Sequence, residues 1–136
     1  FWERIHQQGE SFWTDLVEPL PWMQEVVSLV TDLVGEDWCV VTSPSRCPTS
    51  YSGKAKWLRK FLGSGFDLNR RYLPTGRKEL FAYVPGAVLI DDSDANVNRF
   101  RRAAGRAIVF PRHNNSLYAL KADPVEYVCS QLVEIG

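Results

Sequence analysis

Short apolar runs alternate along the chain with longer segments in which apolar residues recur at helical spacing. The runs that predict strands are rich in β-forming residues: residues 38–41, 71–73, 87–90 and 107–110. Helical spacing is found over other segments: residues 21–34, 54–62, 77–83, 97–104 and 124–135. Strands that alternate with helices are typical of βαβ units, so the sequence predicts an α/β fold with a parallel sheet.

Capping residues mark the ends of several of these helices. A glycine follows three of them, as is common at helix C-termini: Gly35, Gly63 and Gly105. Ser52 is the expected N-cap of the helix over residues 54–62, and Asp123-Pro124 is expected to open the last helix. Residues 1–20 predict a short helix and a loop with aromatic anchors.

The composition narrows the range of functions. The chain has 136 residues and 45% apolar residues, which fits one globular domain. Its formal net charge is zero, which argues against a binding groove for a nucleic acid polymer. No apolar run approaches the roughly 20 residues that span a membrane. The three cysteines show no C-x-x-C spacing, so a reducing compartment, the cytoplasm, is expected, and the two distant histidines do not predict a zinc site.

Two predicted strands end in residues that carry chemistry. In parallel sheets, ligands gather beyond the carboxyl ends of the strands. Asp91-Asp92 follows the run at residues 87–90, and adjacent carboxylates repel each other unless a cation or a set of donors compensates. A hard ion such as Mg²⁺ suits oxygen ligands of this kind. The alternative is that the pair is the N-cap of the following helix.

Thr42-Ser43 follows the first predicted strand and indicates a second candidate group. Hydroxyl and backbone N–H groups at a strand end can hold a phosphate oxygen, although an ordinary polar turn has the same composition. Lys54 lies near the start of the next predicted helix, where its charge can reach an anion that the helix N-terminus also attracts. The alternative for Lys54 is a solvated surface position.

Taken together, these elements resemble the later motifs of the haloacid dehalogenase (HAD) superfamily. The closer resemblance is to the 5'(3')-deoxyribonucleotidases, which have a similar progression of T-S-P, C-P, K-x-x-W and L-I-D-D. This chain has Thr42-Ser43-Pro44, Cys47-Pro48, Lys54 with Trp57, and Val88 to Asp92 in that order. Residues 12–21 also resemble the stretch by which that family leaves its small cap and enters the core.

The resemblance implies a fold and a reaction. The fold would be a HAD-like three-layer sandwich, in which residues 1–20 are a remnant of the cap and its linker and residues 21–136 form the core. The activity would be Mg²⁺-dependent hydrolysis of a phosphomonoester, most readily a (deoxy)nucleoside monophosphate. Thr42 and Ser43 would hold phosphoryl oxygens, and Lys54 would neutralise their charge.

The resemblance also assigns roles to the remaining candidate residues. Asp91 and Asp92 would hold the Mg²⁺. Lys78, which precedes Asp91, is a rival to Lys54 as the phosphate-binding lysine, and a surface position is its alternative. Three aromatic residues would border the base pocket, although core packing explains them equally well: Trp2, Phe12 and Trp13.

One departure from the family pattern affects the catalytic prediction. The family's nucleophile is the first Asp of an Asp-x-Asp motif that ends the central strand, and no such motif precedes Phe1. Asp92-Ser93-Asp94 has the right letters but follows the late strand. We therefore expect a longer polypeptide to supply the first strand and most of the cap, and this chain alone to be inactive. The alternatives are a non-catalytic scaffold or interaction protein, and a phosphatase for another small phosphate such as a sugar phosphate.

Overall fold

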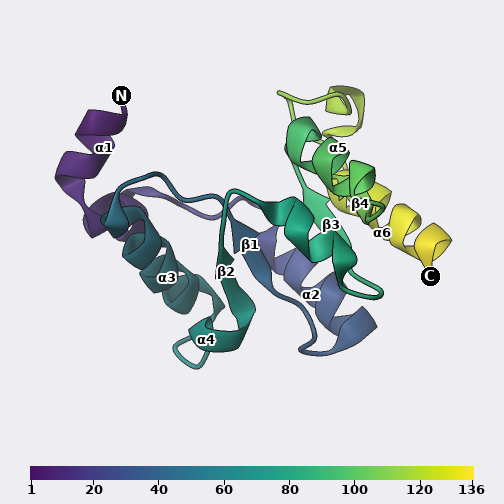
Figure 1. Cartoon of the computed structure of the whole chain (residues 1–136), viewed down its shortest axis with the longest axis horizontal. Helices are drawn as coiled ribbons and strands as arrows, with labels where there is room; N and C mark the ends of the chain where they lie inside the picture. Colours follow the sequence, from purple (N-terminus) through teal and green to yellow (C-terminus); the bar gives the residue numbers. More distant parts are fainter. The chain divides into compact units, whose positions relative to one another are not determined.

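The computed structural model describes residues 1–136, and their contacts group them into two units. Unit 1 is Phe1–Gly76 and unit 2 is Arg77–Gly136, a boundary that the sequence did not predict. Each unit combines helices with one small parallel sheet, which confirms the α/β class (Figure 1). No helix in either unit is both long enough and apolar enough to cross a bilayer.

Unit 1 contains five helical elements and two strands. In chain order these are α1 (Trp2–Gln8), the π-helical turn η1 (Phe12–Leu16), α2 (Met23–Val34), β1 (Val40–Thr42), α3 (Pro48–Leu62), α4 (Leu68–Arg71) and β2 (Tyr72–Pro74). The strands pair in parallel, with Val40 opposite Tyr72 and Thr42 opposite Pro74. Both strands therefore end on the same side of the unit, where Thr42 lies.

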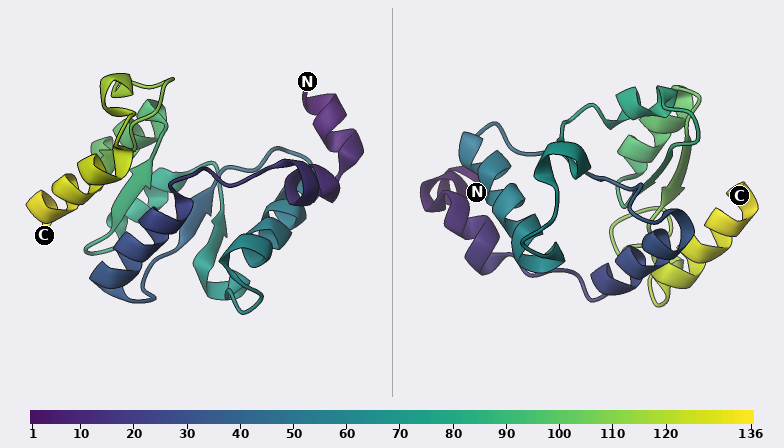
Figure 2. Two further views of the ribbon diagram at one scale, coloured as in Figure 1. Left: turned by 180° about the vertical axis from the view of Figure 1, so that it is seen from behind. Right: turned by 90° about the horizontal axis from the view of Figure 1, so that it is seen from below.

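Unit 2 contains one βαβ arrangement with flanking helices. Its elements are the 3-10 helix η2 (Lys78–Tyr83), β3 (Val88–Asp91), α5 (Asp94–Arg102), β4 (Arg106–Val109), the 3-10 turn η3 (Tyr118–Leu120) and α6 (Pro124–Ile135). β3 and β4 pair in parallel, with Asp91 opposite Val109. Helix α5 packs on one face of this sheet and α6 lies against β4 on the other (Figure 2).

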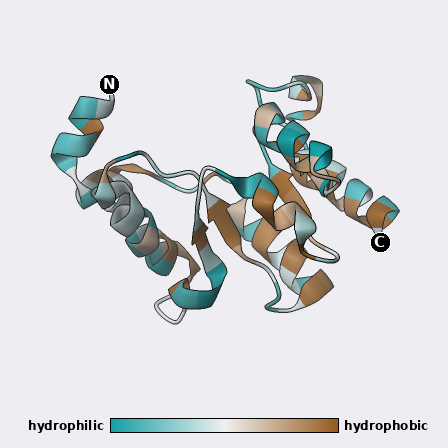
Figure 3. Ribbon diagram, in the orientation of Figure 1, coloured by the Kyte–Doolittle hydropathy of each residue, from teal (hydrophilic) through white to brown (hydrophobic).

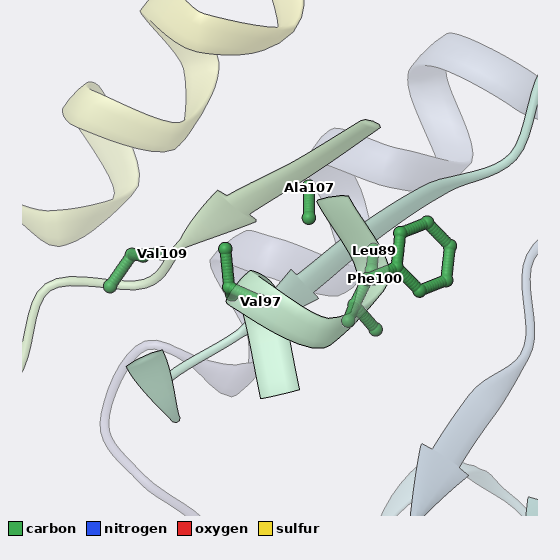
Figure 4. Close-up of a cluster of buried hydrophobic side chains, with 5 residues drawn as sticks. All are labelled: Leu89, Val97, Phe100, Ala107 and Val109. Atoms are coloured by element: carbon green, nitrogen blue, oxygen red, sulfur yellow. The ribbon is translucent and has the colours of Figure 1, made fainter. Parts of the chain in front are cut away.

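The core of unit 2 lies between α5 and the sheet. Val97 and Phe100 are three positions apart on α5, so they share a face, and they are 0% and 2% exposed. They pack against Leu89 of β3 and against Ala107 and Val109 of β4 (Figure 4). This packing fixes β3 in place and thereby sets the position of the acidic residues that end it.

The sequence located most elements correctly. Helix α2 ends before Gly35, which has a φ of 64°, and α3 ends before Gly63, which has a φ of 110°. Both values are in the left-handed region that glycine tolerates best. Helix α6 begins as predicted, since the Asp123 carboxylate accepts a hydrogen bond from the backbone N–H of Glu126.

Two predictions about unit 1 are wrong. The first strand was predicted as buried residues 38–41, but β1 is only half-buried and begins at Val40. Trp38 precedes β1 and stacks on Arg71 instead, with 4.2 Å between the guanidinium carbon and the ring centroid. Ser52 does not cap α3, because the helix already begins at Pro48, with Cys47 as its N-cap.

Some apolar surface and some strand edges have no partner in the structure. The strands form two separate two-stranded sheets, so β1 and β3 each have one unpaired edge. Helix α2 is strongly apolar along one face (Figure 3) but contains no buried residue, and Leu33 and Val34 are 56% and 51% exposed. Unpaired edges of this kind can accept a further strand.

Candidate functional site

The candidate residues fall into two groups, one in each unit, and the first group surrounds the end of β1. The Nζ atom of Lys54 donates to Oγ1 of Thr42 at 2.8 Å and to the carbonyl oxygen of Ser43 at 3.0 Å. Thr42, Ser43 and Lys54 were each predicted as phosphate-binding residues, and the structure brings all three together. A cation and a hydroxyl group thus meet at the carboxyl end of a parallel strand.

Local hydrogen bonds fix the turn that follows β1. The backbone N–H of Thr75 donates to the carbonyl of Thr42 at 2.8 Å, and the Ser43 hydroxyl donates to the carbonyl of Thr75 at 3.2 Å. Because α3 begins at Pro48, Lys54 lies in its second turn and not at its N-terminus. Lys54 is therefore not near the start of its helix, as was predicted, and its ammonium group reaches back to the strand end.

An apolar pocket adjoins this group within unit 1. It has a volume of about 190 Å³ and is lined by Thr42 and Lys54 together with apolar side chains: Trp13, Val17, Val40, Trp57 and Leu58. The Nζ atom of Lys54 lies 4.9 Å from the ring centroid of Trp13. Trp13 is therefore the predicted aromatic residue that borders the candidate site, whereas Trp2 and Phe12 do not line this pocket.

The second group surrounds the end of β3 in unit 2. The Nζ atom of Lys78 lies 2.6 Å from Oδ2 of Asp91, and the two side chains are 11% and 6% exposed. The Asn96 side chain donates to the same oxygen at 3.2 Å, and the backbone N–H of Ser93 donates to Oδ1 at 2.9 Å. Asp91 is thus compensated by a cation and two donors, and the surface position considered for Lys78 is wrong.

Asp92 has a different environment from Asp91. Its side chain is exposed and has no hydrogen bond or ion pair within the chain. Neither aspartate caps α5, because the N-cap is Ser93, whose hydroxyl accepts a hydrogen bond from the backbone N–H of Asn96 at 3.3 Å. The two adjacent carboxylates therefore differ in role: Asp91 is engaged inside the protein, and Asp92 faces solvent.

The end of β3 offers few protein ligands for Mg²⁺. No group of three or more His, Cys, Asp or Glu side chains gathers anywhere in the structure. Mg²⁺ keeps several of its waters and is commonly held through one or two carboxylates together with substrate phosphate. The exposed carboxylate of Asp92 fits that requirement as a single protein ligand, with Asp91 beside it. Further ligands would come from water, from the phosphate or from another segment.

Asn115 is a residue at this end of the sheet that the sequence did not identify. Its side chain is 9% exposed and makes four hydrogen bonds with the backbone. The amide nitrogen donates to the carbonyl of Asp92 at 3.0 Å and of Phe110 at 2.7 Å. The amide oxygen accepts from the N–H groups of Arg112 and Leu117 at 3.2 and 3.0 Å. Asn115 thereby ties the loop after β4 to the backbone of Asp92.

The loop after β4 is attached to α5 by a second contact. Both the hydroxyl and the backbone N–H of Ser116 donate to the Asp94 carboxylate. The hydrogen bond from the hydroxyl and then that from the backbone lower the pKa of Asp94 below its ordinary value, and burial opposes them weakly. The carboxylate of Asp94, the first residue of α5, therefore binds this loop.

Comparison of the chain with protein-family models, with curated proteins and with solved structures found no match in any of the three.

Proposed function

We propose that this chain is part of a Mg²⁺-dependent phosphomonoesterase with a HAD-like fold, related in mechanism to the 5'(3')-deoxyribonucleotidases. The observation that carries the proposal is the contact of Lys54 with Thr42 and Ser43 at the end of β1. A fixed cation next to hydroxyl groups is suited to stabilise the negative charge of a transferring phosphoryl group. The substrate is a (deoxy)nucleoside monophosphate, and the reaction takes place in the cytoplasm.

The residues of this chain bind and orient the phosphate. The Thr42 hydroxyl donates to a phosphoryl oxygen, the Ser43 hydroxyl does so after it leaves the carbonyl of Thr75, and the ammonium group of Lys54 balances the charge of these oxygens. We assign the phosphate-binding role to Lys54 rather than Lys78, because the Nζ atom of Lys78 is engaged by Asp91 at 2.6 Å. Lys78 instead holds the Asp91 carboxylate in place at the end of β3.

Mg²⁺, when bound, supplies positive charge to the phosphoryl oxygens and to the leaving group. Asp92 is the residue of this chain that would hold the ion, because its carboxylate is exposed and has no partner within the chain. Asp91 lies next to Asp92 in the chain and would help to hold the same ion. Lys78 and Asn96 fix the Asp91 carboxylate, and Asn115 fixes the Asp92 backbone.

The nucleophile is an aspartate from a segment outside these 136 residues. The open edge of β1 supports this part of the proposal, because an unpaired edge can accept a further parallel strand. Parallel neighbours end on the same side of a sheet, so an aspartate that ends such a strand would lie next to Thr42.

The apolar pocket beside Lys54 supports a nucleoside as the leaving group. Two tryptophans line it, and aromatic rings are favourable partners for a planar base. A sugar phosphate would present mostly hydroxyl groups to these apolar side chains, so it is the less suitable substrate. The pocket therefore favours the nucleoside monophosphate over the sugar phosphate.

A non-catalytic scaffold is the second candidate function, and one observation favours it. The buried pair of Lys78 and Asp91 is electrically balanced without any metal ion. A protein that had lost catalysis could retain this pair solely to hold η2 against β3. The scaffold differs from the enzyme in one respect that can be measured, since it requires neither Mg²⁺ nor phosphate.

Phosphate release from a deoxynucleoside monophosphate in the presence of Mg²⁺ tests the proposal. The assay compares this chain alone with the same chain carrying its upstream segment, either fused or added as a separate fragment. We expect release only with the upstream segment, and a large loss of release with Asp92→Asn. The matched control Asp32→Asn changes an exposed aspartate of α2 and should leave the rate unchanged.

Two outcomes would contradict the proposal. Turnover by the 136-residue chain alone, at the rate of the extended chain, would show that the nucleophile does not come from outside it. Inactivity of both forms, with no phosphate binding by either, would favour the scaffold.

A further inference from the structure

The ring of Trp13 lies against the ammonium group of Lys54, the cation that the proposed function places on the phosphate. The 4.9 Å between the Nζ atom and the ring centroid is within the roughly 6 Å over which a cation is attracted to an aromatic face. The same nitrogen donates to Thr42 at 2.8 Å. The ammonium group is therefore held by a hydroxyl group and by an aromatic ring together.

Gly53 allows Trp13 to occupy this position. A Cβ atom at Gly53 would lie 2.4 Å from Cδ1 and 2.9 Å from Cγ of Trp13, closer than real Cβ atoms approach their neighbours. Glycine is unfavourable in a helix interior compared with alanine, so its presence within α3 needs a reason. The close packing of the Trp13 ring on the helix backbone supplies that reason.

The segment that carries Trp13 is attached to α3 by two hydrogen bonds to residues that follow Trp13. The indole N–H of Trp57 donates to the carbonyl of Val17 at 2.8 Å, and Lys60 donates to the carbonyl of Thr14 at 2.6 Å. The segment itself, η1, is a π-helical turn, a geometry that is rare and recurs at functional sites. These contacts keep the ring in place on the helix.

We propose that Trp13 is a positioning residue for Lys54, and that Gly53 provides the space that the ring of Trp13 requires. The four-carbon stem of lysine is flexible, and a lysine that must be ordered during binding loses affinity. With the ring in place, the ammonium group already stands at Thr42 before phosphate binds. The inference rests on the proposed phosphate site and adds to it the residue that orders its cation.

The test follows the side-chain ammonium resonance of Lys54 by nuclear magnetic resonance in the 136-residue chain, with and without inorganic phosphate. The variants are Trp13→Phe, which keeps an aromatic ring, Trp13→Leu, which removes it, and Gly53→Ala, which displaces it. Gly65→Ala is the matched control, because a Cβ atom at Gly65 meets nothing within 4 Å.

We expect an ordered Lys54 resonance in the wild type, in Trp13→Phe and in Gly65→Ala. The resonance should broaden in Trp13→Leu and in Gly53→Ala, and phosphate affinity should fall about threefold to tenfold in these two variants. Alanine favours a helix more than glycine does, so unfolding of α3 would not account for the loss in Gly53→Ala. Circular dichroism of each variant checks this point.

The outcomes separate this inference from the proposed function. An unchanged Lys54 resonance in both Trp13→Leu and Gly53→Ala would overturn the positioning role, even if the wild type binds phosphate. Loss of the resonance in these variants, with no phosphate binding by any form, would support the positioning role and overturn the proposed function.

Discussion

The ammonium nitrogen of Lys78 lies 2.6 Å from a carboxylate oxygen of Asp91, and both side chains are almost completely shielded from water. Removing one partner of such a pair leaves an uncompensated buried charge and typically costs about 3–5 kcal/mol. We therefore expect Lys78→Met to unfold much of unit 2. The exposed residue Lys121 offers a control, since Lys121→Met should change stability by no more than about 0.5 kcal/mol.

Two probes allow the units to be followed separately in this experiment. All five tryptophans lie in unit 1, at positions 2, 13, 22, 38 and 57. Tryptophan emission therefore reports on unit 1, whereas amide hydrogen exchange in β3 and β4 reports on unit 2. Lys78→Met should abolish protection of the strand amides. Protection equal to that of the wild type would contradict the importance of the pair.

Asn115 should contribute more to stability than its neighbour of the same type. Asn115→Ala removes four hydrogen bonds and leaves the carbonyls of Asp92 and Phe110 without these donors. One hydrogen bond contributes about 0.5–1.5 kcal/mol net, so the loss of four should lower the free energy of unfolding by about 2 kcal/mol or more, as measured by chemical unfolding. Asn114 is exposed and serves as the control. Equal effects of Asn114→Ala and Asn115→Ala would show that the loop is not held by Asn115.

The thiol of Cys47 should react with alkylating reagents faster in the wild type than in Thr49→Val. A hydrogen bond with the Thr49 side chain, and then one with its backbone, lowers the pKa of Cys47 below its ordinary value of 9.0. A lower pKa means more thiolate at neutral pH, and thiolate is the reactive form. Cys39 provides the internal reference, and its rate should be the same in both proteins. A Cys47 rate that Thr49→Val leaves unchanged would contradict the assigned hydrogen bond.

The contact between Asp94 and Ser116 should stabilise unit 2 in a pH-dependent way. The pKa of Asp94 is lowered in the folded chain, so its contribution is fully present above the ordinary value of 3.8 and is lost as the pH falls from there through the lower folded-state pKa. Ser116→Ala should therefore lower the thermal midpoint of unit 2 by more at pH 7 than at pH 3. An equal effect of Ser116→Ala at both pH values would show that the Asp94 carboxylate is not involved.

The sequence pattern did not predict where α3 begins. Residues 48–53 include serine, threonine and glycine, which are weak helix formers, so the periodic pattern begins only at Lys54. Tertiary contacts extend the helix to Pro48. The Ser50 hydroxyl accepts a hydrogen bond from the N–H of Ser45 at 2.8 Å, and Tyr72 donates to the carbonyl of Tyr51 at 2.8 Å.

The candidate residues were identified from the order of residue types in the sequence. The residues that contact them in the structure were not. Strand ends are recognisable in a sequence, which is why Thr42 and Asp91 were identified correctly as strand-terminal residues. The pairing of Lys78 with Asp91 depends on how η2 folds against β3, and no local pattern encodes that. Asn115 is indistinguishable from Asn114 in the sequence, because only burial separates their roles.

The phosphate site around Lys54 is tested most directly by titrating the 136-residue chain with inorganic phosphate and following the backbone amides of residues 42–45. We predict saturable shifts in the wild type and their loss in Lys54→Met. Arg59→Met, which removes an exposed positive charge from the same helix, should bind phosphate as the wild type does. Phosphate binding by Lys54→Met equal to that of the wild type, or no shift at Thr42 and Ser43 in the wild type, would contradict the account.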